Sequence, residues 1–206
     1  MGEQKVLGVD EFLNKTIERF PEMGRCKDFI ERFIESSEAK RIEIVNFSFG
    51  YDYALGLSLH NVVLFNTKAF DLNLPIFLYT LFHEFAHQYQ FKKYGGEKMY
   101  ELYGEEMNIK EAANTMRNIE LVADEFAMRK IRELIKLGYL NKENEIKNSP
   151  YKNVTMKQFE GLVNGLRKKI RNKGVNTTDE ISDTIYSMVR ANGIKNTFDK
   201  IRTILN

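Results

Sequence analysis

The chain has 206 residues, of which 43% are hydrophobic and 29% are charged, and its formal net charge is +2. These values are typical of one ordinary soluble globular domain, and the small charge gives no argument from composition for a polyanionic partner. Because Cys26 is the only cysteine, an internal disulfide and a thiolate zinc site of the C-x-x-C type are both excluded. The first ten residues lack the apolar core of a signal peptide, and no stretch approaches the ~18–20 apolar residues of a membrane span. We therefore expect a cytoplasmic protein that does not contact a membrane.

Residues 10–36 carry the pattern of two helices that meet at Pro21, with one apolar stripe on each side of the proline. Residues 41–49 then alternate between apolar and polar side chains, which predicts a strand. A second strand is expected over residues 57–66, just before the next helix. His60 falls on this second strand, where a partly exposed histidine is a better interpretation than a metal ligand.

An H-E-x-x-H motif occupies residues 83–87, inside a helix that is predicted to begin near Pro75. On a helix the two histidines, His83 and His87, lie one turn apart on the same face, so both imidazoles can bind one zinc ion. Glu84 lies at the edge of this face, from where its carboxylate can deprotonate a zinc-activated water without being a ligand. The alternative is a core helix with two incidental histidines. However, the chain has only 3 histidines, and two of them fall in the motif.

A long helical pattern at residues 108–137 places Glu120 and Asp124 one turn apart in an otherwise apolar stripe. A carboxylate on a buried helix face is costly unless it is paired or binds a metal. Since two histidines need a third protein ligand to form an open catalytic zinc site, Glu120 is the candidate third ligand. Asp124 can then accept a hydrogen bond from the second ring nitrogen of a ligand histidine. In the alternative interpretation the acidic residues of this helix are solvated, which is what we expect of Glu111 and Glu125.

Residues 139–206 contain no second motif of this kind. Two capping boxes, which begin at Thr155 and Thr177, predict helices that pack on the core through apolar stripes. Residues 152–173 carry seven basic side chains against one acidic side chain. Contact with nucleic acid would rest on this charge pattern alone, and a basic helix face is more often merely solvated.

The motif H-E-x-x-H followed on a later helix by E-x-x-A-D resembles the gluzincin metallopeptidases, with five matching positions: His83, Glu84, His87, Glu120 and Asp124. The stretch from about residue 54 to 130 is also similar to the compact ImmA/IrrE-type metallopeptidase domain. This resemblance implies a zincin-like α+β fold, mostly helical, with a small antiparallel or mixed sheet before the motif helix. It further implies one Zn²⁺ ion and hydrolysis of a peptide bond.

We expect a single domain over residues 1–206, with N-terminal helices at 10–36, a catalytic core at about 41–138 and a helical C-terminal extension at about 155–206. The sequence departs from the compact family members at Gln88, where those members often have a histidine or an aliphatic residue. The resemblance therefore does not assign the chain to one subfamily of these metallopeptidases.

In an enzyme of this kind, Glu84 would pass a proton from the attacking water to the leaving amine of a peptide or protein substrate. The oxyanion usually needs a second donor, for which Tyr139, Tyr151 and His60 are the candidates. Endopeptidase and exopeptidase activity both fit these residues.

Other interpretations stay open beside this one. A non-catalytic zinc-binding module could contact a protein or nucleic-acid partner through its basic tail, although a structural site has no use for Glu84. A regulatory protease that cleaves one intracellular partner is favoured by the ImmA/IrrE resemblance, and an open strand edge beside the zinc could bind an extended substrate. Two histidines and a carboxylate also suit iron or manganese.

Overall fold

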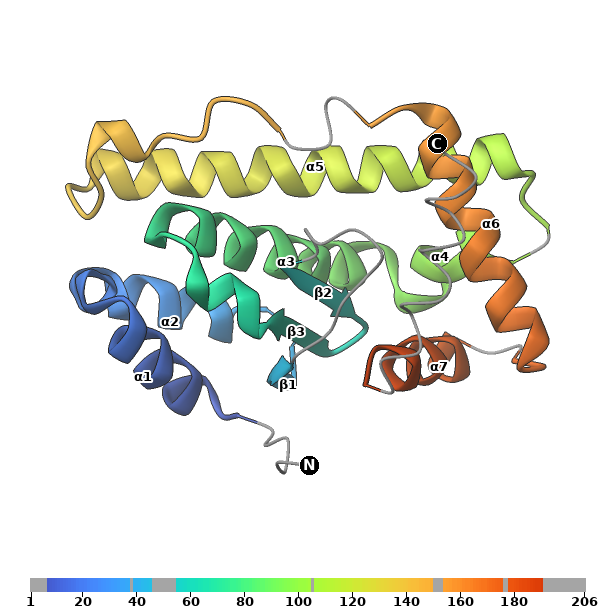
Figure 1. Cartoon of the computed structure of the whole chain (residues 1–206), viewed down its shortest axis with the longest axis horizontal. Coiled ribbons are helices and arrows are strands. Elements are labelled where there is room, and N and C mark those ends of the chain that lie inside the picture. Colours follow the sequence, from blue (N-terminus) through green and yellow to red (C-terminus); the bar gives the residue numbers. More distant parts are fainter. Residues whose placement is uncertain are drawn as a thin grey trace.

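The computed structural model describes residues 7–37, 39–45, 55–104, 106–149, 154–175 and 178–190. The described chain is mostly helical, with one three-stranded mixed sheet that precedes the long helix α3 (Figure 1). The expected fold class, a mostly helical α+β domain with a small sheet before the motif helix, is therefore confirmed.

The N-terminal part forms two helices on either side of Pro21, as predicted. Helix α1 (Val9–Arg19) is followed by the 3₁₀ helix η1 (Pro21–Cys26) and by α2 (Lys27–Glu35). Proline suits the first position of a helix because it has no N–H to leave unpaired and its φ is already helical. Both helices bury their apolar faces in the main core, which also takes in strand β3 and helices α3 and α5.

The sheet has the order β1-β3-β2, with β1 (Arg41–Val45) parallel to β3 (Val62–Asn66) and β2 (Gly56–Leu59) antiparallel to β3. The expectation of one continuous strand over residues 57–66 is wrong, because the chain turns at residues 60–61 and returns as a hairpin. Asn61 has φ 63°, a left-handed conformation that asparagine tolerates better than most residues. His60 consequently lies in a turn and not on a strand.

Helix α3 (Leu74–Tyr94) carries the motif and lies between the sheet and helix α5 (Figure 1). Its start is fixed by the Asn73 side chain, which accepts a hydrogen bond from the Ile76 N–H at 3.1 Å. The helix ends at Gly95, whose φ of 82° is readily adopted only by glycine. Because both its sides are covered, α3 is buried over most of its length, and its polar side chains at positions 83–90 must find partners inside the protein.

Helix α5 (Ile109–Lys136) runs antiparallel to α3 (Figure 1) and begins at Asn108, whose side chain caps the Glu111 N–H. The two helices are connected by α4 (Gly96–Tyr100) and the 3₁₀ helix η3 (Glu101–Tyr103). Two further 3₁₀ helices, η2 and η4, span Thr67–Asp71 and Lys142–Asn144.

The C-terminal part contributes α6 (Met156–Asn172) and α7 (Thr178–Arg190). The predicted capping box of Thr155 with Gln158 is confirmed, whereas Thr177 lies outside the described residues. Helix α6 packs on α5 and η3, and α7 packs on α4, so both lie at the end of the molecule where α3 finishes and α5 begins (Figure 1). Among the described helices, none is long and apolar enough to cross a membrane.

Candidate metal centre

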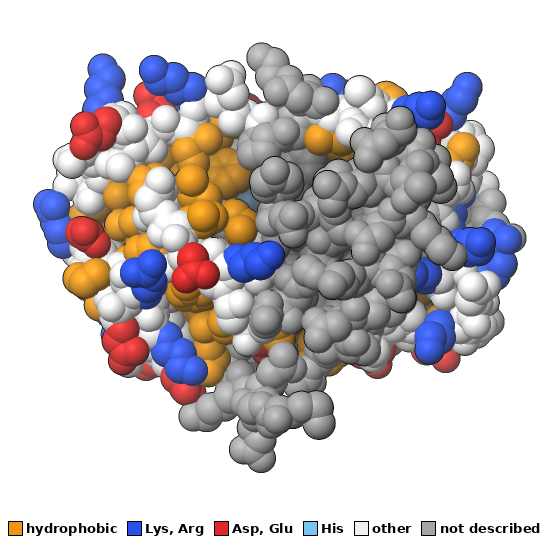
Figure 2. Space-filling model, in the orientation of Figure 1, with side chains coloured by type: hydrophobic (Ala, Val, Ile, Leu, Met, Phe, Trp, Pro, Cys, Tyr) orange, Lys and Arg blue, Asp and Glu red, His pale blue; other side chains and the backbone are white. Residues whose placement is uncertain are grey.

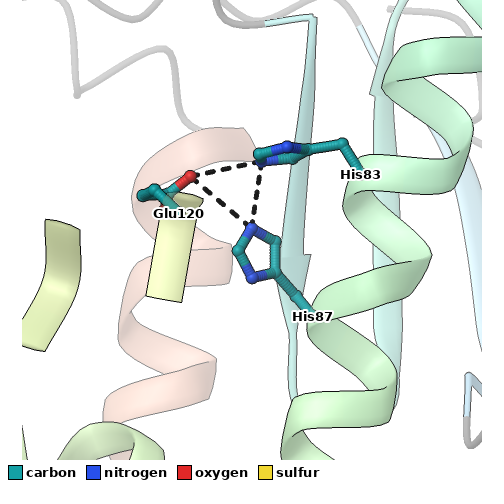
Figure 3. Close-up of side chains that lie close together, drawn as sticks. All are labelled: His83, His87 and Glu120. Carbon is teal, nitrogen blue, oxygen red and sulfur yellow. Dashed lines mark hydrogen bonds and ion pairs between the residues drawn. The ribbon is translucent and has the colours of Figure 1, made fainter. Parts of the chain in front are cut away.

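Two imidazoles from α3 and one carboxylate from α5 point toward a common centre (Figure 3). His83 Nε2 lies 3.2 Å from Glu120 Oε2 and 3.1 Å from His87 Nε2, and His87 Nε2 lies 3.7 Å from Glu120 Oε2. Ligand atoms that each lie about 2.1 Å from one zinc ion in a tetrahedral site are about 3.4 Å from one another. The three separations bracket this value. This buried group can therefore hold a metal ion, with a fourth position left for water or substrate.

The His83 imidazole is oriented by Asp124, one turn beyond Glu120 on α5. His83 Nδ1 lies 2.9 Å from Asp124 Oδ1, so the ring donates its Nδ1 proton to the carboxylate and turns Nε2 toward the centre. Asp124 is fully buried and also accepts hydrogen bonds from the hydroxyls of Tyr79 and Ser149. Three donors thus satisfy this buried carboxylate, which in turn fixes the tautomer and the orientation of His83.

The His87 imidazole is oriented by Gln90, a contact that the sequence analysis missed. His87 Nδ1 lies 2.8 Å from Gln90 Oε1, and Gln90 Nε2 donates to the carbonyl oxygen of Ile119 at 3.0 Å. Since a backbone carbonyl can only accept, the amide nitrogen of Gln90 must face α5 and its oxygen must face the imidazole. His87 therefore carries its proton on Nδ1, which leaves the Nε2 lone pair for a metal.

Because of these two orienting contacts, the centre of the group is surrounded by electron-pair donors and favours a positively charged occupant. With both ring protons on Nδ1, the two Nε2 lone pairs face each other across 3.1 Å, and a carboxylate oxygen completes the triangle. Three electron-pair donors at this separation repel one another unless a cation or a proton lies between them. The donor set thus fits a divalent metal ion that prefers nitrogen and oxygen ligands, as zinc does.

The charges around the centre shift the pKa values of His83 and Glu120 in the directions that favour a proton or a cation between them. Burial lowers the pKa of His83, but the hydrogen bonds to Asp124 and Glu120 outweigh it and raise that pKa to about 10. Burial raises the pKa of Glu120, yet the two nearby histidines hold that pKa well below its usual range. Without a metal, the group therefore retains a proton at neutral pH, and a metal ion binds in competition with it.

Glu84 lies beside the candidate metal-binding group, which we call the metal-binding group (His83, His87 and Glu120), without joining it. The residue is 7% exposed, and among the residues that the structure describes its carboxylate makes neither a hydrogen bond nor an ion pair. Burial raises the pKa of Glu84, although His83 and His87 act in the opposite direction. A buried carboxylate with no partner is costly for the fold, so it points to a role other than stability.

Strand β2 passes directly over the Glu84 side chain, and this requires a glycine. A Cβ atom at position 56 would lie 2.4 Å from Glu84 Cγ and 2.7 Å from its carboxylate carbon. A side chain at this position would force Glu84 or the strand to shift, so Gly56 allows the strand and the carboxylate to lie against each other as they do. Nothing local in the sequence indicates this function of Gly56, because the contact depends on how the strand lies on the helix.

Gln88 ties the β2–β3 hairpin to α3. Its amide nitrogen donates to the carbonyl oxygens of Leu59 at 2.8 Å and Val62 at 3.3 Å, and also to the Ser58 hydroxyl. These are the backbone groups at the two ends of the hairpin turn. The strand edge is thereby held at a fixed distance from the metal-binding face of the helix.

A cavity of about 210 Å³ opens from the metal-binding group. The metal-binding group and Glu84 line it together with all four residues of β2, and the remaining wall is formed by α3, α4, η3, α5, α6 and α7. Tyr103 contributes to this wall, and burial, Tyr100 and Glu120 all raise the pKa of its phenol. Tyr103 therefore stays protonated and able to donate a hydrogen bond near the group.

Of the three expected oxyanion donors, the two that the structure describes, Tyr139 and His60, do not line this cavity. Tyr139 lies beyond the end of α5, where its N–H donates to the Leu134 carbonyl. Leu134 is about 21 Å along the helix from Glu120, a distance that no tyrosine side chain can span. Its ring packs instead against the main core. His60 stacks near Phe91, at 5.7 Å between ring centroids, and lies outside the cavity lining. Tyr151 lies outside the described residues.

Basic side chains gather on the side of the molecule where α6 lies, whereas both signs of charge are mixed over the side formed by α1 and α2 (Figure 2). This distribution matches the basic run of residues 152–173, and nucleic-acid contact through it stays a prediction.

No protein-family model, no curated protein and no solved structure matches the chain.

Proposed function

We propose that this protein is a zinc-dependent metallopeptidase of the gluzincin type. The observation that carries the proposal is the buried Glu84 carboxylate, which has no partner among the described residues and lies next to a histidine–histidine–glutamate group of zinc-site dimensions. A structural metal site needs no such carboxylate, whereas a hydrolytic site needs a base that is not itself a ligand.

A zinc ion held by His83, His87 and Glu120 would supply a Lewis acid that lowers the pKa of water toward 7 and polarises a substrate carbonyl. The raised pKa of Glu84 suits the base in this reaction, because a carboxylate that is too acidic accepts a proton poorly. Glu84 would take one proton from the attacking water as its oxygen bonds to the carbonyl carbon. The same proton would then pass to the leaving amine as the C–N bond breaks.

The substrate would be an extended peptide that pairs with the edge of β2. Among the described strands, β2 has only β3 as a neighbour, so its outer edge is available for main-chain hydrogen bonds. Every residue of β2 also lines the cavity that contains Glu84. A peptide on this edge would bring its carbonyls next to the metal-binding group. Among the described residues, the Tyr103 hydroxyl is the candidate for a second donor to the oxyanion.

The competing function is a zinc-binding interaction module that does not catalyse a reaction. One experiment separates the two. A mixture of peptides from a digested proteome is incubated with the zinc-loaded wild-type protein and with Glu84→Gln, and new chain ends are identified by mass spectrometry. The proposal expects cleavage by the wild type that Glu84→Gln lacks although it retains zinc. Zinc binding by both proteins with no cleavage by either would favour the interaction module.

A further inference from the structure

The cavity beside the metal-binding group is lined mainly by apolar side chains. Beyond Glu84 and the three candidate ligands, its polar groups are Ser58 and the hydroxyls of Tyr100 and Tyr103. The other side chains come from seven elements: Leu57, Leu59, Phe91, Met99, Leu102, Met116, Ile119, Phe159, Leu162, Leu166 and Ile185. A lining of this kind binds apolar groups and discriminates poorly among polar ones.

The two C-terminal helices form the far wall of this cavity. Helix α6 contributes Phe159, Leu162 and Leu166, and α7 contributes Ile185. None of these side chains is needed to hold a metal. The C-terminal extension is thus part of the pocket and not only a layer packed on the core.

Polar contacts anchor both helices to the rest of the domain. From α6, Arg167 Nε donates to the Leu102 carbonyl at 3.0 Å. From α7, the Tyr186 hydroxyl donates to the buried Glu43 carboxylate, at 2.7 Å from Oε1. The Arg41 guanidinium donates at 2.7 Å both to this carboxylate and to the Tyr186 hydroxyl, so Tyr186 ties α7 to strand β1. Because its helices are fixed at these points, the wall has a defined position relative to Glu84.

The size of the cavity sets the size of the group that it can hold. A cavity of about 150 Å³ lined by aliphatic and aromatic side chains is known to accept benzene. At about 210 Å³, this cavity accommodates a leucine- to phenylalanine-sized side chain with little room to spare. Filling the cavity with such a group removes apolar surface from water. Each buried CH₂ should raise the affinity roughly fourfold.

We propose that this cavity is an apolar specificity subsite, closed by α6 and α7, that selects peptides with a leucine- to phenylalanine-sized side chain next to the scissile bond. The inference rests on the proposed peptidase function. Its occupant follows from the position of β2: in an extended peptide paired with this edge, successive side chains alternate in direction, so one side chain enters the cavity that the edge lines.

The test uses amino-acid hydroxamates, which chelate zinc through the hydroxamate and carry one side chain each. Binding of the glycine, alanine, leucine and phenylalanine hydroxamates to the zinc-loaded protein is measured by calorimetry, so that no turnover is needed. We expect the leucine and phenylalanine compounds to bind at least tenfold more tightly than the glycine compound. Equal affinity across the series would overturn the subsite while leaving the metal centre intact. Failure of every compound to bind a zinc-loaded protein would overturn the subsite and the open zinc site together.

Variants at Leu162 test whether α6 forms the wall. Leu162→Phe fills the cavity and should weaken binding of the phenylalanine hydroxamate at least tenfold. Binding of the glycine hydroxamate should be unchanged. Leu162→Ala enlarges the cavity and should shift the preference toward the phenylalanine compound. The matched control is Lys157→Phe, which adds the same side chain at an exposed position of the same helix. Unchanged binding of the glycine compound shows that each variant is folded, and an unchanged side-chain preference in both Leu162 variants would contradict the proposal.

Discussion

The backbone of Gly56 and the side chain of Glu84 occupy adjoining space that leaves no room for a Cβ atom, which would lie 2.4 Å from Glu84 Cγ. This contact joins the strand edge proposed to bind substrate to the carboxylate proposed to act as base. Because Gly56 is not among the candidate ligands, a substitution at this position tests the proposed catalysis separately from metal binding.

Replacing Gly56 with alanine should therefore reduce peptide cleavage at least tenfold while zinc is retained. The added methyl group must displace either Glu84 or β2, and a displacement of about 1 Å at a reacting group is enough for a loss of up to a hundredfold. Peptide cleavage and zinc content are measured on the same preparation. The control is Gly24→Ala, where a Cβ would meet nothing closer than 4.0 Å. Full activity of Gly56→Ala would contradict the role assigned to this contact.

Removing the Gln90 amide should weaken zinc binding. In Gln90→Ala, His87 loses the acceptor that holds its Nδ1 proton, so its ring can rotate and change tautomer. Loss of such an orienting partner typically lowers metal affinity tenfold to a hundredfold. Affinity is measured by competition with a chromophoric chelator, with Lys93→Ala on the exposed face of the same helix as the control. Equal affinity in wild type and Gln90→Ala would show that the amide does not orient the ligand.

Zinc affinity should rise with pH between 6 and 8. Without metal, the pKa of His83 is raised to about 10 by Asp124 and Glu120 against the effect of burial, so zinc must displace a proton throughout this range. Displacement of one proton makes the affinity increase about tenfold for each pH unit. The same proton stabilises the metal-free fold below pH 6.5, and this contribution is lost as the pH rises to about 10. Chelator competition at several pH values measures the slope, and a slope of zero would contradict the raised pKa.

Replacing Gln88 with alanine should lower the free energy of unfolding by roughly 1–3 kcal/mol, because the hydrogen bonds that its amide donates to the hairpin, each worth about 0.5–1.5 kcal/mol, are lost. The affected carbonyls are those of Leu59 and Val62 at the ends of the hairpin turn. Urea denaturation of the metal-free protein measures the change, with the exposed Lys92→Ala as the control. If the two variants were equally stable, the hairpin would have to be held by other contacts.

The parts of the site that the sequence predicts are those set by helical periodicity. The i, i+4 spacing of His83 and His87 and of Glu120 and Asp124 places each pair on one helix face, and both faces turn out to be buried. Helix ends were also predictable where local chemistry defines them, as at the Thr155 capping box.

The parts that the sequence does not predict depend on tertiary packing. The roles of Gly56 and Gln88 follow from how the hairpin lies on α3, and the turn at Asn61 is hidden in a run that reads as one strand. Tyr139 follows the third ligand in the chain but lies far along α5, because a helix carries successive residues away at 1.5 Å each. Closeness in sequence to Glu120 is therefore no guide to which tyrosine lines the cavity, as Tyr103 does.

The measurement that tests the central claim most directly is the zinc content of the purified protein beside Glu120→Gln and Glu84→Gln. Both variants remove one carboxylate charge and keep the side-chain shape, but only Glu120 belongs to the metal-binding group. We expect one zinc ion per chain in the wild type and in Glu84→Gln, and loss or strong weakening of zinc binding in Glu120→Gln. Absence of zinc from the wild type after the metal is added back, or equal zinc in all three proteins, would contradict the assigned ligand set.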